Sequence, residues 1–295
     1  MTEYRETTPE MAVTSTPPPA PPEVPELTII AVHGNGGSKT RFQRAQPHMP
    51  HSIRFRAVTL PGFADMPRDP ALQSLYDYAN YLRQIILEET PPIVLLGHGV
   101  GASITLEYIQ RFASTVNGIV LHSPVGVRAK QRFFARLMQI PVARNIAQHL
   151  FAAPYMRPIL SRLLFSHPVP NEYLERFFHD YRSCDVFAQM FELITTAWFD
   201  ALQPRQIPAV LLWGEREQRL SIEQMHVYQH LLPNNITRIV SNWDHFPMVE
   251  QPEQYAREVV RLARMMLEKA AAPTNGTAAI EVVTGRGNSF EIRID

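Results

Sequence analysis

An apolar, strand-like run ends at Leu96 in a turn where glycine occupies every second position, at Gly97, Gly99 and Gly101, and a helical pattern follows directly. Glycines two before and two after the centre of such a segment permit a strained, closely packed turn that projects its central residue above a sheet. The central residue here is Gly99, which has no side chain. The turn therefore offers only backbone chemistry: the N–H of Val100, at a helix N-terminus, could hold a carbonyl oxygen or an anion.

Taken with this turn in chain order, four other stretches resemble the α/β-hydrolase superfamily. They are HGNGGS at 33–38, LPGFAD at 60–65, LLWGEREQ at 211–218 and WDHFPMVEQP at 243–252. In that family they would be the oxyanion loop, the turn after the next strand, the strand that precedes the acid and the histidine loop, while GHGVG at 97–101 occupies the place of the nucleophile elbow. With the strand and helix alternation, the resemblance covers residues 27–270.

The resemblance implies roles for particular residues. His245 would be the base and Glu217 its acid, with Glu215 as the competing choice. A carboxylate bound to one ring nitrogen fixes the tautomer and leaves the other nitrogen basic near neutral pH. Val100 and Asn35 would supply the two oxyanion N–H groups, and the ligand-binding positions would be His33, Gly34 and His98. For His98 and His245 the alternative is a purely structural role.

The departure from the family is Gly99, because the family places serine, aspartate or cysteine there. A covalent route through this position is excluded. A substitute nucleophile would need to lie within about 3 Å of its base. The candidates for that substitution are Ser38, Ser103, Ser123 and Cys184.

The surrounding elements predict an α/β fold, with a mainly parallel sheet flanked by helices. Short apolar runs such as LTIIAV, PIVLL, GIVLH and AVLLW alternate with amphipathic segments, and strands that are apolar on both faces indicate a sheet covered on both sides. Ligands of such sheets bind beyond the carboxyl ends of the strands. Those ends carry the turn and the loops named above.

Composition shifts divide the chain into four parts. Residues 1–26 are a proline-rich tail expected to be disordered, residues 27–125 and 204–271 form the core, and residues 126–203 are predicted to be a helical lid. Residues 272–295 read as a linker and a β-hairpin. Because the family usually opens with a hairpin at one sheet edge and this chain has prolines there, we expect the C-terminal hairpin to supply that edge. The alternatives are exchange with a second subunit or an unpaired tail.

Bulk properties limit the class of protein. The formal net charge is zero, which gives no reason to expect nucleic acid, but residues 126–182 carry nine Lys or Arg against three acids. We expect Arg128 to Arg136 to meet an anionic portion of a ligand. A single cysteine, no secretory signal and no bilayer-length apolar run predict a soluble cytoplasmic protein, with no integral membrane segment. No metal-ligand spacing or phosphate loop is present, so no metal or cofactor is expected.

Two functions fit these observations. The first is an enzyme that acts on a small, largely apolar ester, lactone, thioester or related carbonyl compound through water or proton transfer governed by His245 and Glu217. The second is an inactive α/β-hydrolase-fold binding or scaffold protein, with the tails as the route to a homodimer or protein partner. An engineered inactive variant is a third alternative, although such a change usually introduces alanine.

Overall fold

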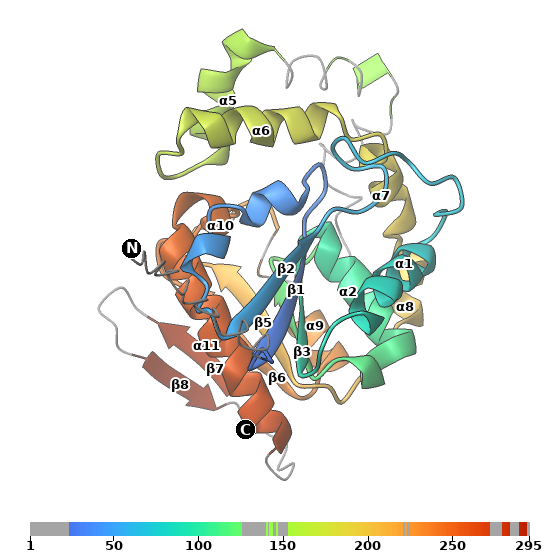
Figure 1. Ribbon diagram of the computed structural model, residues 1–295, viewed down its shortest axis with the longest axis vertical. Coiled ribbons are helices and arrows are strands. Elements are labelled where there is room, and N and C mark those ends of the chain that lie inside the picture. The colour runs from blue at the N-terminus through green and yellow to red at the C-terminus, as the bar shows by residue number, and fades with distance from the viewer. Residues whose placement is uncertain are drawn as a thin grey trace, which may run out of the picture.

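A computed structural model describes residues 24–125, 140, 142–143, 146, 153–220, 222, 225–271, 279–283 and 289–293. Within these ranges one sheet runs through the molecule in the strand order β2-β1-β3-β4-β5-β6-β7-β8 (Figure 1). All neighbouring strands are parallel except the last pair, β7 and β8. The strands are β1 (Leu27–Val32), β2 (Ile53–Val58), β3 (Ile93–His98), β4 (Gly118–His122), β5 (Ala209–Gly214), β6 (Asn235–Val240), β7 (Ala279–Val283) and β8 (Ser289–Arg293).

Helices cover both faces of the sheet, as predicted from its apolar strands. Every residue of β1, β3, β4 and β5 is buried. Alternate strand residues contribute to two separate cores, because successive side chains of a strand point to opposite faces. One core includes residues of α1 (Leu75–Leu87), α2 (Val100–Phe112), α8 (Thr196–Ala201) and α9 (Met225–Leu231), and the other includes residues of α10 (Pro247–Glu250) and α11 (Pro252–Ala271).

Local sequence explains where α1 begins. Ser74 caps α1, since its side chain accepts from the N–H of Asp77 while the Asp77 carboxylate accepts from the N–H of Ser74. Short 3-10 turns complete the connections that the structure describes: η1 (Lys39–Phe42), η2 (Gln46–His48), η3 (Ala113–Thr115) and η5 (Pro154–Met156).

Between β4 and β5 the chain forms a helical insertion, defined here as η5 together with α5 (Arg157–Leu164), α6 (Asn171–Arg182), α7 (Phe187–Leu193) and α8. Figure 1 shows α5 and α6 stacked beyond one end of the sheet, with α7 and α8 descending along its side. The first part of the predicted lid, including Arg128 and Arg136, lies outside the described residues. So does the N-terminal tail up to residue 23.

The C-terminal hairpin joins the sheet, but at the edge opposite to the one expected. β7 pairs with β6, whereas β2 is the strand at the other edge of the described sheet. The expectation that the hairpin replaces the family's N-terminal edge hairpin is therefore wrong. The physical reason is the connection, because β6, α11 and β7 form a crossover between neighbouring parallel strands, which needs no return of the chain across the sheet.

Candidate active site

The turn at the end of β3 connects this buried strand directly to α2 through Gly99. Gly99 has φ 55° and ψ −114°, and its N–H donates to the carbonyl of His122 at 3.0 Å. A Cβ at Gly97 would lie 2.5 Å from the carbonyl oxygen of Gly101, and one at Gly101 would lie 2.5 Å from that of Val32. The flanking glycines are thus required by close backbone approach, as the sequence pattern predicts.

The centre of the turn, in contrast, is open. A Cβ at Gly99 would meet only Gly34 Cα at 3.5 Å and Leu220 Cδ1 at 3.8 Å, both ordinary van der Waals distances. The space around Gly99 would therefore admit a Cβ. The positive φ is the one feature of this position that disfavours a side chain.

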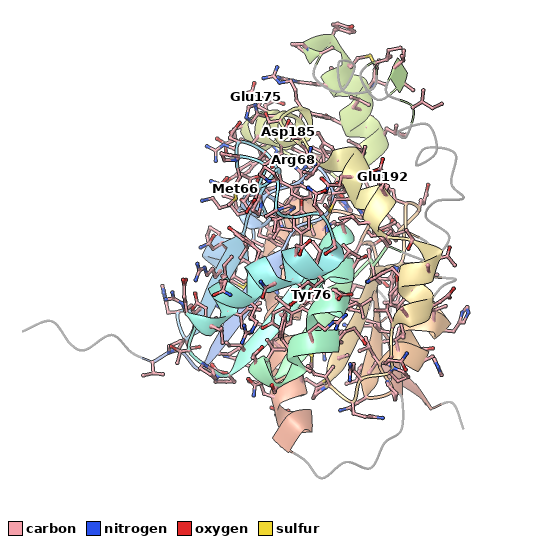
Figure 2. All side chains as sticks on the ribbon, turned by 90° about the vertical axis from the view of Figure 1, so that its right-hand side faces the viewer. Met66, Arg68, Tyr76, Glu175, Asp185 and Glu192 are labelled. Atoms are coloured by element: carbon pink, nitrogen blue, oxygen red, sulfur yellow. The ribbon has the colours of Figure 1, made fainter. Side chains whose placement is uncertain are left out.

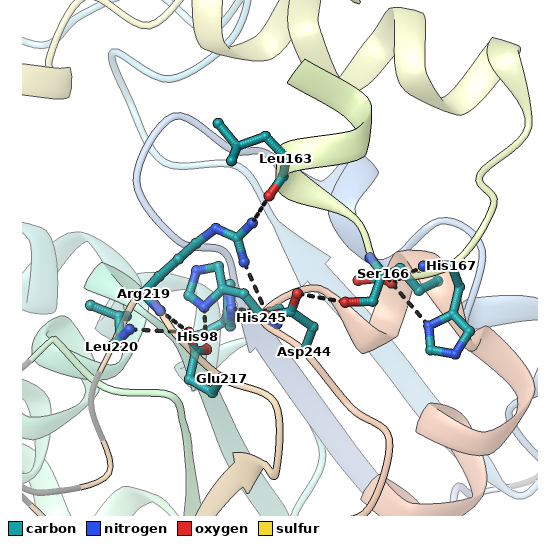
Figure 3. Close-up of polar contacts among 10 residues, drawn as sticks. His98, Leu163, Ser166, His167, Glu217, Arg219, Leu220, Asp244 and His245 are labelled. Carbon is teal, nitrogen blue, oxygen red and sulfur yellow. Dashed lines mark hydrogen bonds and ion pairs between the residues drawn. The ribbon is translucent and has the colours of Figure 1, made fainter. Parts of the chain in front are cut away.

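His245 and Glu217, to which the family resemblance assigns the roles of base and acid, are in direct contact. The two side chains meet at 2.5 Å between Nδ1 and Oε2, and the Glu217 side chain is buried (Figure 3). The other carboxylate oxygen of Glu217 accepts from the N–H groups of Arg219 at 2.6 Å and Leu220 at 3.0 Å. Glu215 instead accepts from the N–H of Asn242 at the surface. The geometry thus selects Glu217 over Glu215 as the partner of His245.

The environment of Glu217 keeps its carboxyl ionised. Burial opposes ionisation, but the charge and hydrogen bond of His245, together with the N–H groups of Leu220 and Arg219, outweigh it and lower the pKa to about 2. An ionised Glu217 accepts from Nδ1–H of His245, which leaves Nε2 of that ring as the basic nitrogen. Among the described residues, no hydroxyl, thiol or other protein group is hydrogen-bonded to this Nε2.

The loop after β1 borders the same space. His33 is buried and bridges two segments, since its Nδ1 donates to the Gly34 carbonyl at 2.9 Å and its Nε2 accepts from the N–H of Leu60 at 3.2 Å. Burial lowers the pKa of His33 to about 4, which keeps the ring neutral. In the part of the chain described, the backbone N–H groups of Asn35 and Val100 have no protein acceptor. Both N–H groups are therefore available as hydrogen-bond donors to a ligand.

His98, the third of the predicted ligand-binding positions, has a supporting position. It is buried, and its Nε2–H donates to the carbonyl of His245 at 3.0 Å. Its ring packs between the tilted rings of His245, with 4.6 Å between centroids, and His122, with 4.8 Å between centroids. His98 thus fixes the backbone of the histidine loop against the elbow.

Replacing His122 by phenylalanine is expected to flatten the loss of stability in acid. Burial, and next the charge of His245, lower the pKa of His122 to about 3, and neither ring nitrogen has a hydrogen-bond partner among the described residues. Because an unfolded histidine titrates near 6.5, unfolding takes up a proton at His122 between about pH 6.5 and about pH 3, so stability falls as pH falls. Urea unfolding at several pH values should show a slope smaller by about 1.4 kcal/mol per pH unit in H122F. An unchanged slope would contradict this account.

The alternative nucleophiles do not replace Gly99. The Ser38 hydroxyl donates to Asp180 of α6 at 2.7 Å, and Ser103 is buried within α2. Ser123, which follows β4, is buried with φ 42°. Cys184 is buried, and burial raises the pKa of its thiol to about 12, so it carries no thiolate at neutral pH. In the described structure none of the four is hydrogen-bonded to His245.

Several contacts between the insertion and the site could not be predicted. The Arg41 guanidinium is buried 3.5 Å from the centroid of the Phe177 ring and donates to the Gly36 carbonyl in the oxyanion loop at 2.9 Å. The Tyr181 ring fills the space beside Gly36, where a Cβ would lie 2.3 Å from it. These contacts join α6 to the loop after β1 and to η1, which lie more than 130 residues earlier in the sequence, and no local sequence motif predicts them.

A second set of contacts connects the insertion to the acid and histidine loops (Figure 3). Arg219 donates to the carbonyl of Leu163 in α5 at 2.8 Å and to Asp244 at 3.1 Å. The Ser166 hydroxyl donates to the other oxygen of Asp244 at 2.8 Å. The end of α5 is therefore tied to residues that neighbour Glu217 and His245 in sequence.

The described residues contain no group of three or more His, Cys, Asp and Glu side chains that could hold a metal ion. Among the helices that the structure describes, none is long and apolar enough to cross a membrane.

Comparison with known proteins fits this architecture. A model of the alpha/beta hydrolase family matches residues 29–258, which is most of the chain. The chain belongs to this family. An uncharacterized protein of Mycobacterium tuberculosis (strain ATCC 25618 / H37Rv) is 21% identical over 259 residues, covering 79% of this chain and 74% of its own.

Other relatives are similarly distant. The uncharacterized hydrolase YugF of Bacillus subtilis (strain 168) is 23% identical over 243 residues, covering 79% of this chain and 88% of its own. An esterase from Exiguobacterium antarcticum superposes with a TM-score of 0.65 at 15% identity, over 82% of this chain and 93% of that chain. This last likeness establishes a shared fold.

Proposed function

We propose that this alpha/beta hydrolase hydrolyses a small, largely apolar ester, lactone or thioester without a covalent intermediate. The observation that carries the proposal is the Glu217–His245 pair, complete at 2.5 Å, in a chain whose elbow is empty above Gly99. A scaffold has no evident need for a buried, ionised carboxylate bound to a histidine whose other nitrogen has no partner in the described structure. The hydrolase relatives named above favour the same class of reaction.

The proposed reaction uses water in the place of the missing side chain. Nε2 of His245 takes a proton from a water molecule above Gly99 while the water oxygen bonds to the substrate carbonyl carbon. The N–H groups of Asn35 and Val100 hold the resulting oxyanion. When the intermediate collapses, the bond to the leaving alcohol or thiol breaks, and that group recovers the proton from His245. Acid and alcohol, or acid and thiol, leave the site.

The experiment is turnover of a panel of short esters, lactones and thioesters by the parent protein and by His245→Ala. We expect turnover by the parent to exceed that by H245A by about a hundredfold or more, because a positioned general base contributes acceleration of that order. H245A should retain only the roughly thousandfold acceleration over the uncatalysed reaction that oxyanion stabilisation and positioning supply. Equal rates for the parent and H245A would remove His245 from the reaction.

A binding or scaffold protein is the second candidate, and the observation that favours it is Gly99 itself. A family member that has lost its nucleophile can keep the pocket as a ligand site. In that case the parent would bind a non-hydrolysable ketone analogue of the ester but would turn over no member of the panel. The same panel therefore separates the two functions.

A further inference from the structure

The tip of the insertion carries an unusual concentration of exposed apolar side chains. Nine large apolar residues are exposed in the described part of the chain, and six of them fall between Ile140 and Leu163. Three belong to η5 and α5: Tyr155 is 73% exposed, Ile159 60% and Leu163 71%. Figure 1 shows α5 on the far side of α6 from the sheet, at the outer end of the molecule.

The exposed residues form one face of the segment. Ile159 and Leu163 are one helical turn apart in α5, and Tyr155 lies one turn earlier. We call these three residues the docking face. The opposite side of α5 packs against the protein, because Leu160 is buried in a core cluster with Phe165 and Phe177. The docking face is therefore a second apolar surface, separate from the one that folds the helix.

The charge of the surrounding sequence is wholly positive. Residues 126–171 contain seven Lys or Arg and no Asp or Glu. Arg162, in α5 between Ile159 and Leu163, is exposed, while Arg157 forms an ion pair with Glu175 of α6 at 3.5 Å. Apolar side chains flanked by arginines favour a surface that is negatively charged outside and apolar beneath. A second copy would instead bring like charges together.

We propose that the docking face binds the surface of an anionic phospholipid bilayer. Tyr155, Ile159 and Leu163 insert among the headgroups and upper acyl chains, and the exposed Arg162 contacts lipid phosphates. The inference concerns binding and does not depend on the proposed reaction. Binding to anionic lipid would explain the excess of positive charge in residues 126–171.

The test is co-sedimentation of the full-length protein with vesicles. We expect binding to equal parts of phosphatidylglycerol and phosphatidylcholine, weaker binding at high salt and little binding to phosphatidylcholine alone. The double variant Ile159→Glu/Leu163→Glu should bind the anionic vesicles about tenfold or more weakly. The matched control is Tyr76→Glu/Leu87→Glu, which changes two exposed residues of α1, a helix separate from the insertion (Figure 2).

Two further measurements make the outcome decisive. Circular dichroism melting should show that both double variants are folded like the parent. Arg162→Glu, which leaves the three residues of the docking face unchanged, should weaken vesicle binding. Absence of parent binding to anionic vesicles, equal binding to neutral ones, or equal loss in the α1 control would overturn the proposal. Parent dimers in sedimentation velocity that dissociate in I159E/L163E, without vesicle binding, would assign the face to a second copy.

Discussion

Replacing Gly99 by serine is expected to convert this protein into an efficient esterase toward activated short esters such as 4-nitrophenyl butyrate. The substitution restores a hydroxyl at the centre of the elbow, where the family places its nucleophile, and Nε2 of His245 is the base that would take its proton. We expect kcat to rise by about a hundredfold or more over the parent, since a complete triad exceeds the residual catalysis of the remaining apparatus by at least that factor. A burst equal to the enzyme concentration should reveal the acyl-enzyme.

The structure gives a physical reason to expect that Gly99→Ser folds. The nearest atoms to a new Cβ would be Gly34 Cα at 3.5 Å and Leu220 Cδ1 at 3.8 Å, so no neighbour has to move to admit the Cβ. The cost lies in the backbone, because φ 55° is unfavourable for any residue with a side chain and costs about 1–3 kcal/mol. A modestly lower free energy of unfolding with a large gain in activity is the expected combination.

The control for this gain is Gly99→Ala, which introduces the same Cβ and the same backbone strain without a hydroxyl. G99A should be no more active than the parent and should lose a similar amount of stability. If G99S folds and gains no more activity than G99A, then the assignment of His245 as the base and of Asn35 and Val100 as oxyanion donors is wrong.

Sequence alone could predict those parts of the site that are local. The close backbone approaches at Gly97 and Gly101 follow from their spacing in a strand-turn-helix segment, and the structure has both. The choice of Glu217 over Glu215 was open in the sequence, because both follow Gly214 within three residues. The turn after β5 decides it: the N–H of Glu217 donates to the carbonyl of Gly214, and the Glu217 side chain meets His245 whereas that of Glu215 meets Asn242.

Sequence could not predict contacts that depend on how distant segments pack. Arg41 carries no signal of its own, yet it is buried between the oxyanion loop and α6. The edge chosen by the C-terminal hairpin was mispredicted because alternation identifies a strand but not its neighbour. That neighbour is set by the crossover through α11, which is a property of chain connection.

Arg219 contacts both Glu217, on which the proposed hydrolysis depends, and Leu163, which is part of the proposed membrane-binding surface. Its backbone N–H holds Glu217 Oε1 at 2.6 Å, and its guanidinium donates to the carbonyl of Leu163 at 2.8 Å. Leu163 belongs to the docking face. A bilayer that binds the docking face would therefore contact an element that is hydrogen-bonded to the loop of Glu217.

Replacing Glu217 by glutamine in the Gly99→Ser background is expected to lower kcat by about a thousandfold or more, since loss of the carboxylate in a triad allows the wrong histidine tautomer and removes stabilisation of the imidazolium. Glu215→Gln is the matched control, because Glu215 lies two residues away and bonds to Asn242 rather than to His245. Steady-state kinetics with 4-nitrophenyl butyrate should leave the control within a few-fold of G99S.

The pH dependence of the free energy of unfolding tests Glu217→Gln and Glu215→Gln, each made in the parent protein, independently of turnover. The pKa of Glu217 is about 2 in the folded protein, because the charge and hydrogen bonds of His245 and the loop outweigh burial, and it is near 4.5 when unfolded. Its ionised form therefore stabilises the fold above about pH 4.5, and this contribution is lost as pH falls toward 2. The difference in free energy of unfolding between the parent and E217Q should shrink over that interval, while E215Q follows the parent. A thousandfold kinetic loss in E215Q instead would make Glu215 the acid.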